Sequence, residues 1–143
     1  MNITSAVKAE DNALATISSV QRELKKGLRK AGLLVARRAR QLVPQPGYPG
    51  DKPELKPLRD TIGVEVKEGD VTLYAVIGPQ RPAGAHGHLV EGAKPVRHHS
   101  HGRPTGVVLK PNPFLAPAVL TTAAAQKTAM LKALKAATRK AAK

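Results

Sequence analysis

The stretch IGVEVKEGDVTLYAVI, residues 62–77, decides the fold class of this 143-residue chain. Apolar residues alternate with polar or small ones in both of its halves, and Glu68-Gly69-Asp70 separates the halves. A period of two places alternate side chains on one face of a strand, and a break with glycine between two such runs is typical of a hairpin turn. We therefore predict an antiparallel β-hairpin over residues 61–78 with one buried face.

The segment before the hairpin has the periodicity of a long helix. Its apolar stripe consists of Leu14, Ile17, Leu24, Leu28, Ala31, Val35 and Leu42. Spacings of three, four or seven residues place these side chains on one helical face, which predicts a helix over residues 11–42. Asp11 or Asn12 is the expected N-cap. Pro44 ends the helix, because the residue before a proline is pushed out of helical geometry.

Two glycines within the first helix and an alanine-rich C-terminal segment give further information on the helices. Gly27 and Gly32 interrupt good helix formers, which favours a close crossing with another element or a kink. The alanine-rich segment at the other end of the chain predicts a second helix over residues 114–139, with Pro117 in its first turn.

The middle of the chain is rich in turn-forming residues. All 12 prolines lie between Pro44 and Pro117. We predict an extended arm over residues 44–57, a long loop over 79–105 and a third strand over 106–110. The expected fold is a single α+β domain over residues 1–143. In it, a small antiparallel sheet, the hairpin plus the third strand, packs against a long N-terminal and a C-terminal helix, with two long Pro/Gly-rich loops.

Composition narrows the functional classes. The chain has no cysteine, which excludes a disulfide scaffold, a thiolate metal site and a cysteine nucleophile. We expect no membrane span and no secretion signal, because no apolar run is long enough and the first residues lack the pattern of a signal peptide. The net charge is +14. Residues 1–43 and 114–143 each carry an excess of six positive charges, so the helical ends should attract polyanions or acidic protein surfaces.

Catalytic and metal-binding patterns are weak. The histidines are His86, His88, His98, His99 and His101. They lie in a predicted loop of Gly and Pro, which does not aim side chains at a common point, so a surface or interface loop is the simpler interpretation. The sequence has no nucleophile elbow and no phosphate-binding loop. We predict that the protein is not an enzyme and uses no cofactor; the alternative is a metal-dependent enzyme that uses the histidine loop.

The basic helical faces are the candidate contacts for DNA or for an acidic partner protein. The residues concerned are Lys25, Lys26, Arg29, Lys30, Arg37 and Arg40. Sequence-independent attraction to the phosphates of double-stranded DNA is one interpretation, and a solvated helix face that only aids solubility is another. The near absence of aromatic residues argues against a protein that stacks on single-stranded bases.

Three sets of segments together resemble a known family. The first set is AGLLVARRARQLVP (31–44) with LRDTI (58–62), the second is YAVIG (74–78) with HLVEG (88–92), and the third is PFLAPA (113–118). Their order and spacing are similar to the small neck, tail-completion or head–tail joining proteins of long-tailed double-stranded DNA bacteriophages. In that family a helix ending in Val-Pro leads to a Leu-Arg-x-Ser/Thr-Ile strand, and a Val-Glu-x-Gly element precedes a Pro-Phe-Leu-x-Pro-Ala turn that opens the last helix.

The resemblance implies a structural virion protein at the head–tail junction, assembled in the host bacterial cytoplasm. It implies a homo-oligomeric ring, commonly a hexamer, that contacts other neck and tail proteins such as a head-closure or adaptor protein, a tail terminator or the tail tube. A tail-terminator ring is an alternative within the same class, and a nonspecific double-stranded DNA-binding protein is an alternative of another class. The expected interface residues are Pro46, Tyr48, Pro49, Leu55, His86, His88, Leu89, His98, His99 and Phe114.

Overall fold

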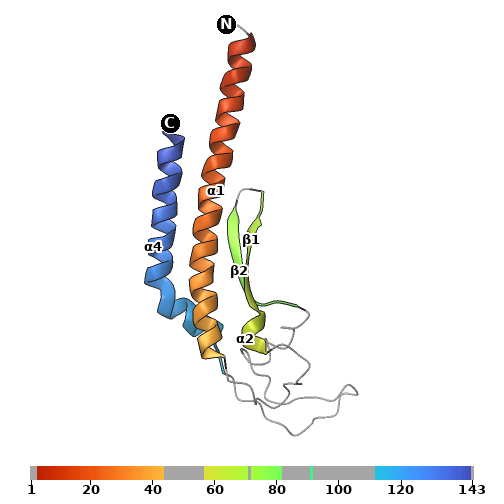
Figure 1. Cartoon of the computed structure of the whole chain (residues 1–143), viewed down its shortest axis with the longest axis vertical. Coiled ribbons are helices and arrows are strands. Elements are labelled where there is room, and N and C mark those ends of the chain that lie inside the picture. Colours follow the sequence, from red (N-terminus) through yellow and green to blue (C-terminus); the bar gives the residue numbers. More distant parts are fainter. Residues whose placement is uncertain (1–2, 44–56, 71, 82–90, 92–111, 143) are drawn as a thin grey trace. The chain divides into compact units, whose positions relative to one another are not determined.

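The computed structural model describes residues 3–43, 57–70, 72–81, 91 and 112–142, with side chains from residue 12 onward (Figure 1). In chain order the elements are α1 (Ile3–Leu42), α2 (Leu58–Thr61), β1 (Ile62–Glu68), β2 (Leu73–Pro79) and α4 (Leu115–Ala141). The strands β1 and β2 form a two-stranded antiparallel sheet. Two long helices with a hairpin confirm the α+β class.

The hairpin follows the alternation that predicted it. Along β1, Ile62 is buried and Val64 and Val66 are partly buried, whereas Glu65 and Lys67 point to solvent. The backbone N–H of Gly69 donates to the carbonyl oxygen of Thr72 at 2.8 Å and closes the turn. The apolar face of the sheet is therefore the face that the period of two identified.

The described residues divide into two compact units, and each of the long elements contributes to both. The first unit comprises residues 1–32, 65–76 and 124–143, and the second comprises residues 33–64 and 77–123. In the first unit α1 lies between α4 and the hairpin (Figure 1). The expectation that both helices pack on the sheet therefore does not hold there, because α4 packs on α1.

Small side chains make this packing possible. In the first unit the buried residues are Gly27, Ala31, Gly32, Ala129, Ala133 and Ala137. A Cβ atom added at Gly27 would collide with the Cβ of Ala133, so the glycine permits the close crossing of α1 and α4. Of the two outcomes considered for Gly27, the close crossing is the one found, and α1 runs on as a helix through this position.

The larger apolar side chains are buried in the second unit. Val35, Ala36, Ala39 and Val43 of the first long segment pack with Leu58, Ile62, Phe114 and Ala118. Leu42, Val64, Ile77 and Leu115 pack against this cluster from its edge. Fully burying a side chain such as Phe114 contributes about 1.5–3 kcal/mol, so these contacts dominate the apolar burial of the unit.

Two expectations about local structure need correction. The helix α1 begins at Ile3, so Asp11 and Asn12 lie inside it and do not cap it. Residues 58–61 form the short helix α2 before β1, where the resemblance implied a strand. The helix forms because the N–H of Asp60 donates to the Pro57 carbonyl oxygen at 2.9 Å and the Thr61 hydroxyl donates to the Leu58 carbonyl oxygen at 2.7 Å.

Other expectations are confirmed or lie outside the described residues. The helix α1 ends at Leu42, as Pro44 predicted, and α4 begins and ends within two residues of the prediction. The arm 44–56, residues 82–90 and 92–111 of the long loop and the third strand 106–110 lie outside the described residues. Neither long helix, over its described length, has an apolar stretch sufficient to cross a membrane.

Candidate functional site

A carboxylate from the long loop caps the first turn of α4. The Glu91 side chain accepts the backbone N–H of Phe114 at 2.8 Å, that of Leu115 at 3.0 and 3.1 Å, and that of Ala116 at 3.1 Å. The first N–H groups of a helix have no partner inside the helix, and a negative charge there is favourable. Glu91 therefore satisfies three backbone donors and fixes the start of α4.

The cap lies next to the apolar cluster of the second unit. Phe114 is fully buried in that cluster while its backbone N–H is held by Glu91. The cluster also contains Val43 and Ile62, and Ile77 packs against it. Each segment of the phage-protein resemblance thus contributes at least one residue either to this cluster or to the cap.

Arg40 has a structural role in the same unit. Its guanidinium donates to the carbonyl oxygen of Ile62 from Nη2 at 2.6 Å and from Nε at 3.2 Å. These bonds tie the last turns of α1 to the first residue of β1. Arg40 stays exposed and its charge is not neutralised by the carbonyl oxygen, so its contact with DNA or an acidic partner stays a prediction.

Ion pairs occupy part of the basic surface of the first unit. Lys25 contacts Glu68 of the hairpin at 2.7 Å. Glu23 lies between Lys140 at 2.8 Å and Lys26 at 3.0 Å. Hydrogen bonds, first from Lys140 and then from Lys26, hold the pKa of Glu23 below its ordinary value. Lys25 and Lys26 are thus not free cations, although both stay partly exposed.

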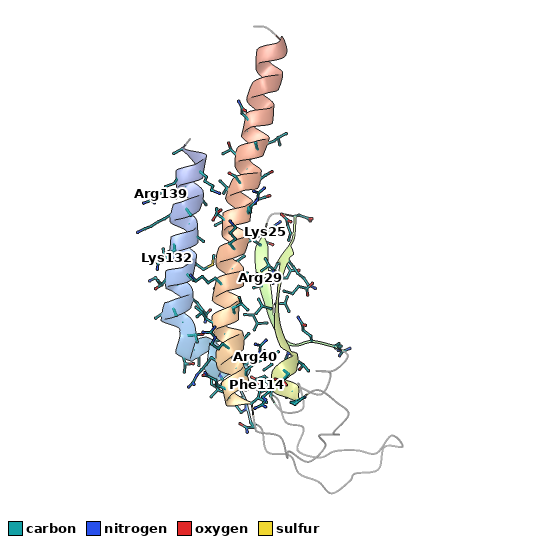
Figure 2. All side chains as sticks on the ribbon, viewed as in Figure 1. Lys25, Arg29, Arg40, Phe114, Lys132 and Arg139 are labelled. Carbon is teal, nitrogen blue, oxygen red and sulfur yellow. The ribbon has the colours of Figure 1, made fainter. Side chains whose placement is uncertain are left out.

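Unpaired basic side chains remain on both helices. Arg29 and Lys30 on α1 are exposed, and neither makes an ion pair with a residue that the structure describes. Lys127, Lys132, Lys135 and Arg139 are exposed on the part of α4 that belongs to the same unit. Figure 2 shows Lys132 and Arg139 extending from the side of α4 away from α1. In the second unit Arg37 is exposed as well.

The surface of the first unit carries a strong excess of positive charge. Among the described side chains of the first unit, eleven are basic and four are acidic. The acidic ones are Glu23, Glu65, Glu68 and Asp70. An excess of this size attracts polyanions without any base-specific contact.

The structure places only one of the predicted interface residues. Phe114 has 0% of its surface exposed, so the side chain is held in the core of its own chain and is not presented to a partner. Its aromatic ring is the largest of the fully buried side chains, which explains this position. The other predicted interface residues, Pro46, Tyr48, Pro49, Leu55, His86, His88, Leu89, His98 and His99, lie outside the described residues.

No metal-binding constellation occurs in the described part of the chain, where no three His, Cys, Asp or Glu residues converge. All five histidines lie outside that part. The acids of the hairpin are accounted for by solvent or by ion pairs with Lys25 and Lys67.

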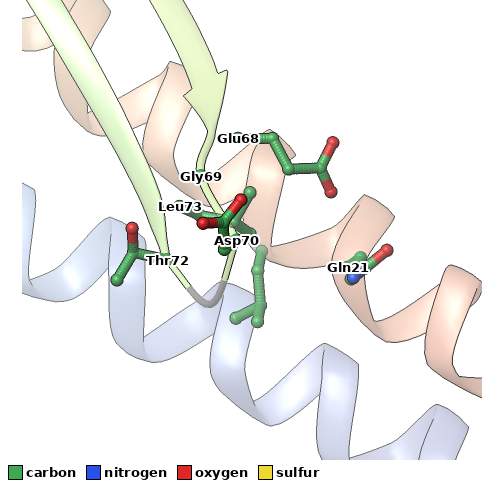
Figure 3. A pocket seen from close by; sticks show the side chains of 7 residues that line it. Gln21, Glu68, Gly69, Asp70, Thr72 and Leu73 are labelled. Atoms are coloured by element: carbon green, nitrogen blue, oxygen red, sulfur yellow. The ribbon is translucent and has the colours of Figure 1, made fainter.

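A shallow pocket lies beside the hairpin turn. Gln21 and Leu24 of α1 line it together with Glu68, Asp70 and Leu73, and its volume is about 430 Å³ (Figure 3). Two carboxylates on its rim make it the acidic spot of an otherwise basic unit. Among the described residues no group of three His, Cys, Asp or Glu side chains converges at this pocket.

No family model, curated protein or solved structure matches the chain.

Sequence reasoning missed two of the residues that organise the site. Glu91 was noted only as part of a resemblance, and Arg40 was grouped with surface cations. One local signal pointed to Glu91: no Ser, Thr or Asp stands immediately before α4, where one would normally cap the helix. A helix start without its own cap requires an acceptor from elsewhere for its N–H groups, and an isolated acid in the preceding loop is a natural source.

Proposed function

We propose that this chain is a structural subunit of the head–tail junction of a long-tailed double-stranded DNA phage, acting in tail completion as part of a ring. One observation carries the proposal. The segments that resemble the neck and tail-completion proteins, although spread from residue 31 to residue 118, meet around one apolar cluster and one helix cap. Segments that come together in space are explained more simply by shared structure than by chance similarity of short motifs.

The chemistry of the described surface agrees with an assembly role. Its exposed charges offer attraction to DNA or to acidic neighbours, and its acids occur as isolated surface groups or ion pairs. A neck ring surrounds the path of the genome, so a basic lining is compatible with the same role. The arm 44–57 and the long loop 79–105 are the proposed contacts with neighbouring copies and with other neck proteins, because extended segments can add to a sheet edge or wrap a partner. A third strand over 106–110 would extend the chain's own sheet.

To test the proposal, the gene for this chain is interrupted in its phage genome, and the resulting lysate is imaged by electron microscopy. DNA-filled heads and separate tails are expected, with joined particles restored when the chain is supplied from a plasmid. Tails of abnormal length would instead favour a tail-terminator ring. Normal joined particles from the interrupted gene would overturn both roles.

Nonspecific binding to double-stranded DNA is a second candidate function, favoured by the unpaired cations Arg29, Lys30, Lys132 and Arg139. Its signature is an affinity that falls steeply with salt. A gel-shift titration of duplex DNA tests it, and absence of retardation at low salt would remove it.

A further inference from the structure

The first turns of α1 extend beyond the elements that cover the rest of the helix. Lys140 contacts Glu23, so the last turn of α4 lies beside residue 23 of α1. The N-terminal end of α1 extends beyond the end of α4 and beyond the hairpin turn (Figure 1). Leu14 and Ile17, two large aliphatic side chains one helical turn apart on α1, are 58% and 53% exposed.

These two residues belong to a regular heptad pattern. Leu14, Ile17, Gln21, Leu24, Leu28 and Ala31 follow one another at spacings that alternate between three and four. In the sequence the same spacing continues backward through Glu10, Val7 and Ile3. We call this set of nine residues the heptad stripe. Alternating spacings of three and four are the signature of a helix that packs along its length against a second helix.

Only part of the heptad stripe is covered by the chain itself. Ala31 is buried and Leu24 and Leu28 are partly buried, whereas Leu14 and Ile17 are exposed. Leu24 lines the open pocket beside the hairpin turn together with Leu73. The exposed part of the stripe offers an apolar face to a second helix.

The distribution of charge favours a second copy of this chain as that helix. Residues 1–21 contain one basic and two acidic residues, whereas residues 22–40 contain eight basic residues and one acidic residue. Two copies with a net charge of +14 each repel one another over most of their surfaces. The first turns of α1 are a segment where two copies can meet without that repulsion.

We propose that two copies associate through these turns as an antiparallel helix pair, with Leu14 of each copy opposite Ile17 of the other. In this register Glu10 lies opposite Gln21, and Val7 lies opposite Leu24. The two polar positions of the heptad stripe thus meet each other, and the remaining layers are apolar. A parallel pair would instead place Glu10 against Glu10, which is unfavourable for two carboxylates.

The pocket beside the hairpin turn fits this arrangement. Gln21 and Leu24 line the pocket together with Leu73, and the register brings Val7 of the second copy to that position. The pocket rim also carries Asp70 and Glu68, the latter paired with Lys25 of the same copy.

The inference stands independently of the proposed neck function. An antiparallel pair is a two-fold contact that closes at two copies, whereas a ring grows through head-to-tail contacts. The pair is therefore a state of the free protein, and it can be present or absent whether or not the chain joins heads to tails.

Sedimentation equilibrium of the full chain tests the pairing. Wild-type protein is expected to dimerise, and Leu14→Asp or Ile17→Asp is expected to weaken dimerisation by about tenfold or more, because a charge would be buried in an apolar contact. Leu134→Asp is the matched control, since Leu134 is also 53% exposed but lies on α4. A monomeric wild type, or dimerisation that Ile17→Asp leaves unchanged, would overturn the proposal.

Introduced cysteines test the register, since the natural chain has none. A mixture of Glu10→Cys and Gln21→Cys chains should form a disulfide between the two variants, while neither variant alone should cross-link. In the antiparallel register two copies of position 10 lie eleven residues apart along the axis, about 16 Å at the rise of a helix, which is beyond the reach of a disulfide. Cross-linking of Glu10→Cys alone would show a parallel pair and refute the register.

Discussion

The Glu91 carboxylate accepts the backbone N–H of Phe114 at 2.8 Å, so one loop residue holds both the start of α4 and the largest fully buried side chain among the described residues. The bond spans 23 positions of the chain. It joins the packing of the core to the capping of a helix, and removal of the carboxylate should disturb both.

Replacing Glu91 should therefore destabilise the protein. Glu91→Ala removes a charged acceptor from three N–H groups and should cost about 2–3 kcal/mol of the free energy of unfolding. Glu91→Gln retains one carbonyl acceptor and should cost about 1 kcal/mol. Urea denaturation followed by circular dichroism measures both. The control is Glu65→Ala, an exposed acid on β1, which should change stability by less than about 0.5 kcal/mol; equal losses at the two sites would contradict the assignment of Glu91 as the cap.

Arg40 and Arg37 should differ sharply although they lie on the same turn of α1. Arg40→Ala leaves the Ile62 carbonyl oxygen without its two donors and should cost about 1–2 kcal/mol of unfolding free energy. Arg37→Ala should have little effect, because Arg37 is exposed. Thermal melts of the two variants under identical conditions make the comparison. Similar melting temperatures would mean that the hydrogen bonds of Arg40 make no net contribution to the free energy of unfolding.

Gly27 and Ala133 should behave as a coupled pair. Gly27→Ala improves helix propensity by about 1 kcal/mol, but its Cβ collides with that of Ala133. Overpacking of this kind costs about 1–3 kcal/mol, so the net change should be neutral to destabilising. In the double variant Gly27→Ala with Ala133→Gly the collision is relieved. A double-mutant cycle should show a coupling energy of at least about 0.5 kcal/mol, and strictly additive changes would rule out the close approach.

The Glu23 contacts should make stability depend on pH. The hydrogen bonds from Lys140 and Lys26 lower the pKa of Glu23 in the folded protein. Glu23 therefore contributes to stability above its unfolded pKa of about 4.5, and this contribution is lost as the pH falls through its folded pKa. Lys140→Met should reduce stability near neutral pH, and its effect should fade as the pH falls below about 4.5 and through the folded pKa of Glu23. Lys132→Met is the control, because Lys132 is an exposed lysine on the same helix. Differences that persist unchanged into acid would exclude the ion pair as their source.

The unpaired cations of α1 should govern any binding to duplex DNA. If Arg29 and Lys30 lie on phosphates, the double variant Arg29→Ala with Lys30→Ala should reduce the slope of log affinity against log salt by about 0.9 for each phosphate that is no longer neutralised. Gel shifts between about 50 and 200 mM salt give that slope. Lys67→Ala serves as control, since Lys67 is paired with Glu65 on the hairpin. An unchanged slope in the double variant would place the DNA-binding surface elsewhere.

Local patterns predicted the parts of the fold whose causes are local. The hairpin was predictable because strand periodicity and a glycine turn agree, and the end of α1 because Pro44 forbids its continuation. The start of α1 was misplaced because Asp11 is a good N-cap, yet no residue between Ile3 and Glu10 breaks a helix. Short elements such as α2 depend on one or two hydrogen bonds, here accepted by the carbonyl oxygens of Pro57 and Leu58, and leave no periodic signal.

The site depended on contacts that the sequence does not reveal. Arg37 and Arg40 look alike in the sequence, and only the position of the Ile62 carbonyl oxygen separates a surface charge from a structural one. Glu91 reaches α4 across a long loop, and no spacing rule connects a loop acid to a helix that begins 24 residues later. The exposure of Ile17 could not be predicted either. The sequence shows one continuous apolar stripe, and only the structure shows that the last turn of α4 contacts α1 at Glu23.

The buried apolar residues include many alanines, namely Ala31, Ala36, Ala39, Ala118, Ala129, Ala133 and Ala137, against five larger side chains. An alanine methyl group hides little hydrocarbon, so unfolding should expose less apolar area than is usual for a chain of this length. Both the heat-capacity increment and the denaturant sensitivity scale with that area. The described core should consequently give a denaturant transition that extends over a broad range of concentration and a stability that falls little on cooling.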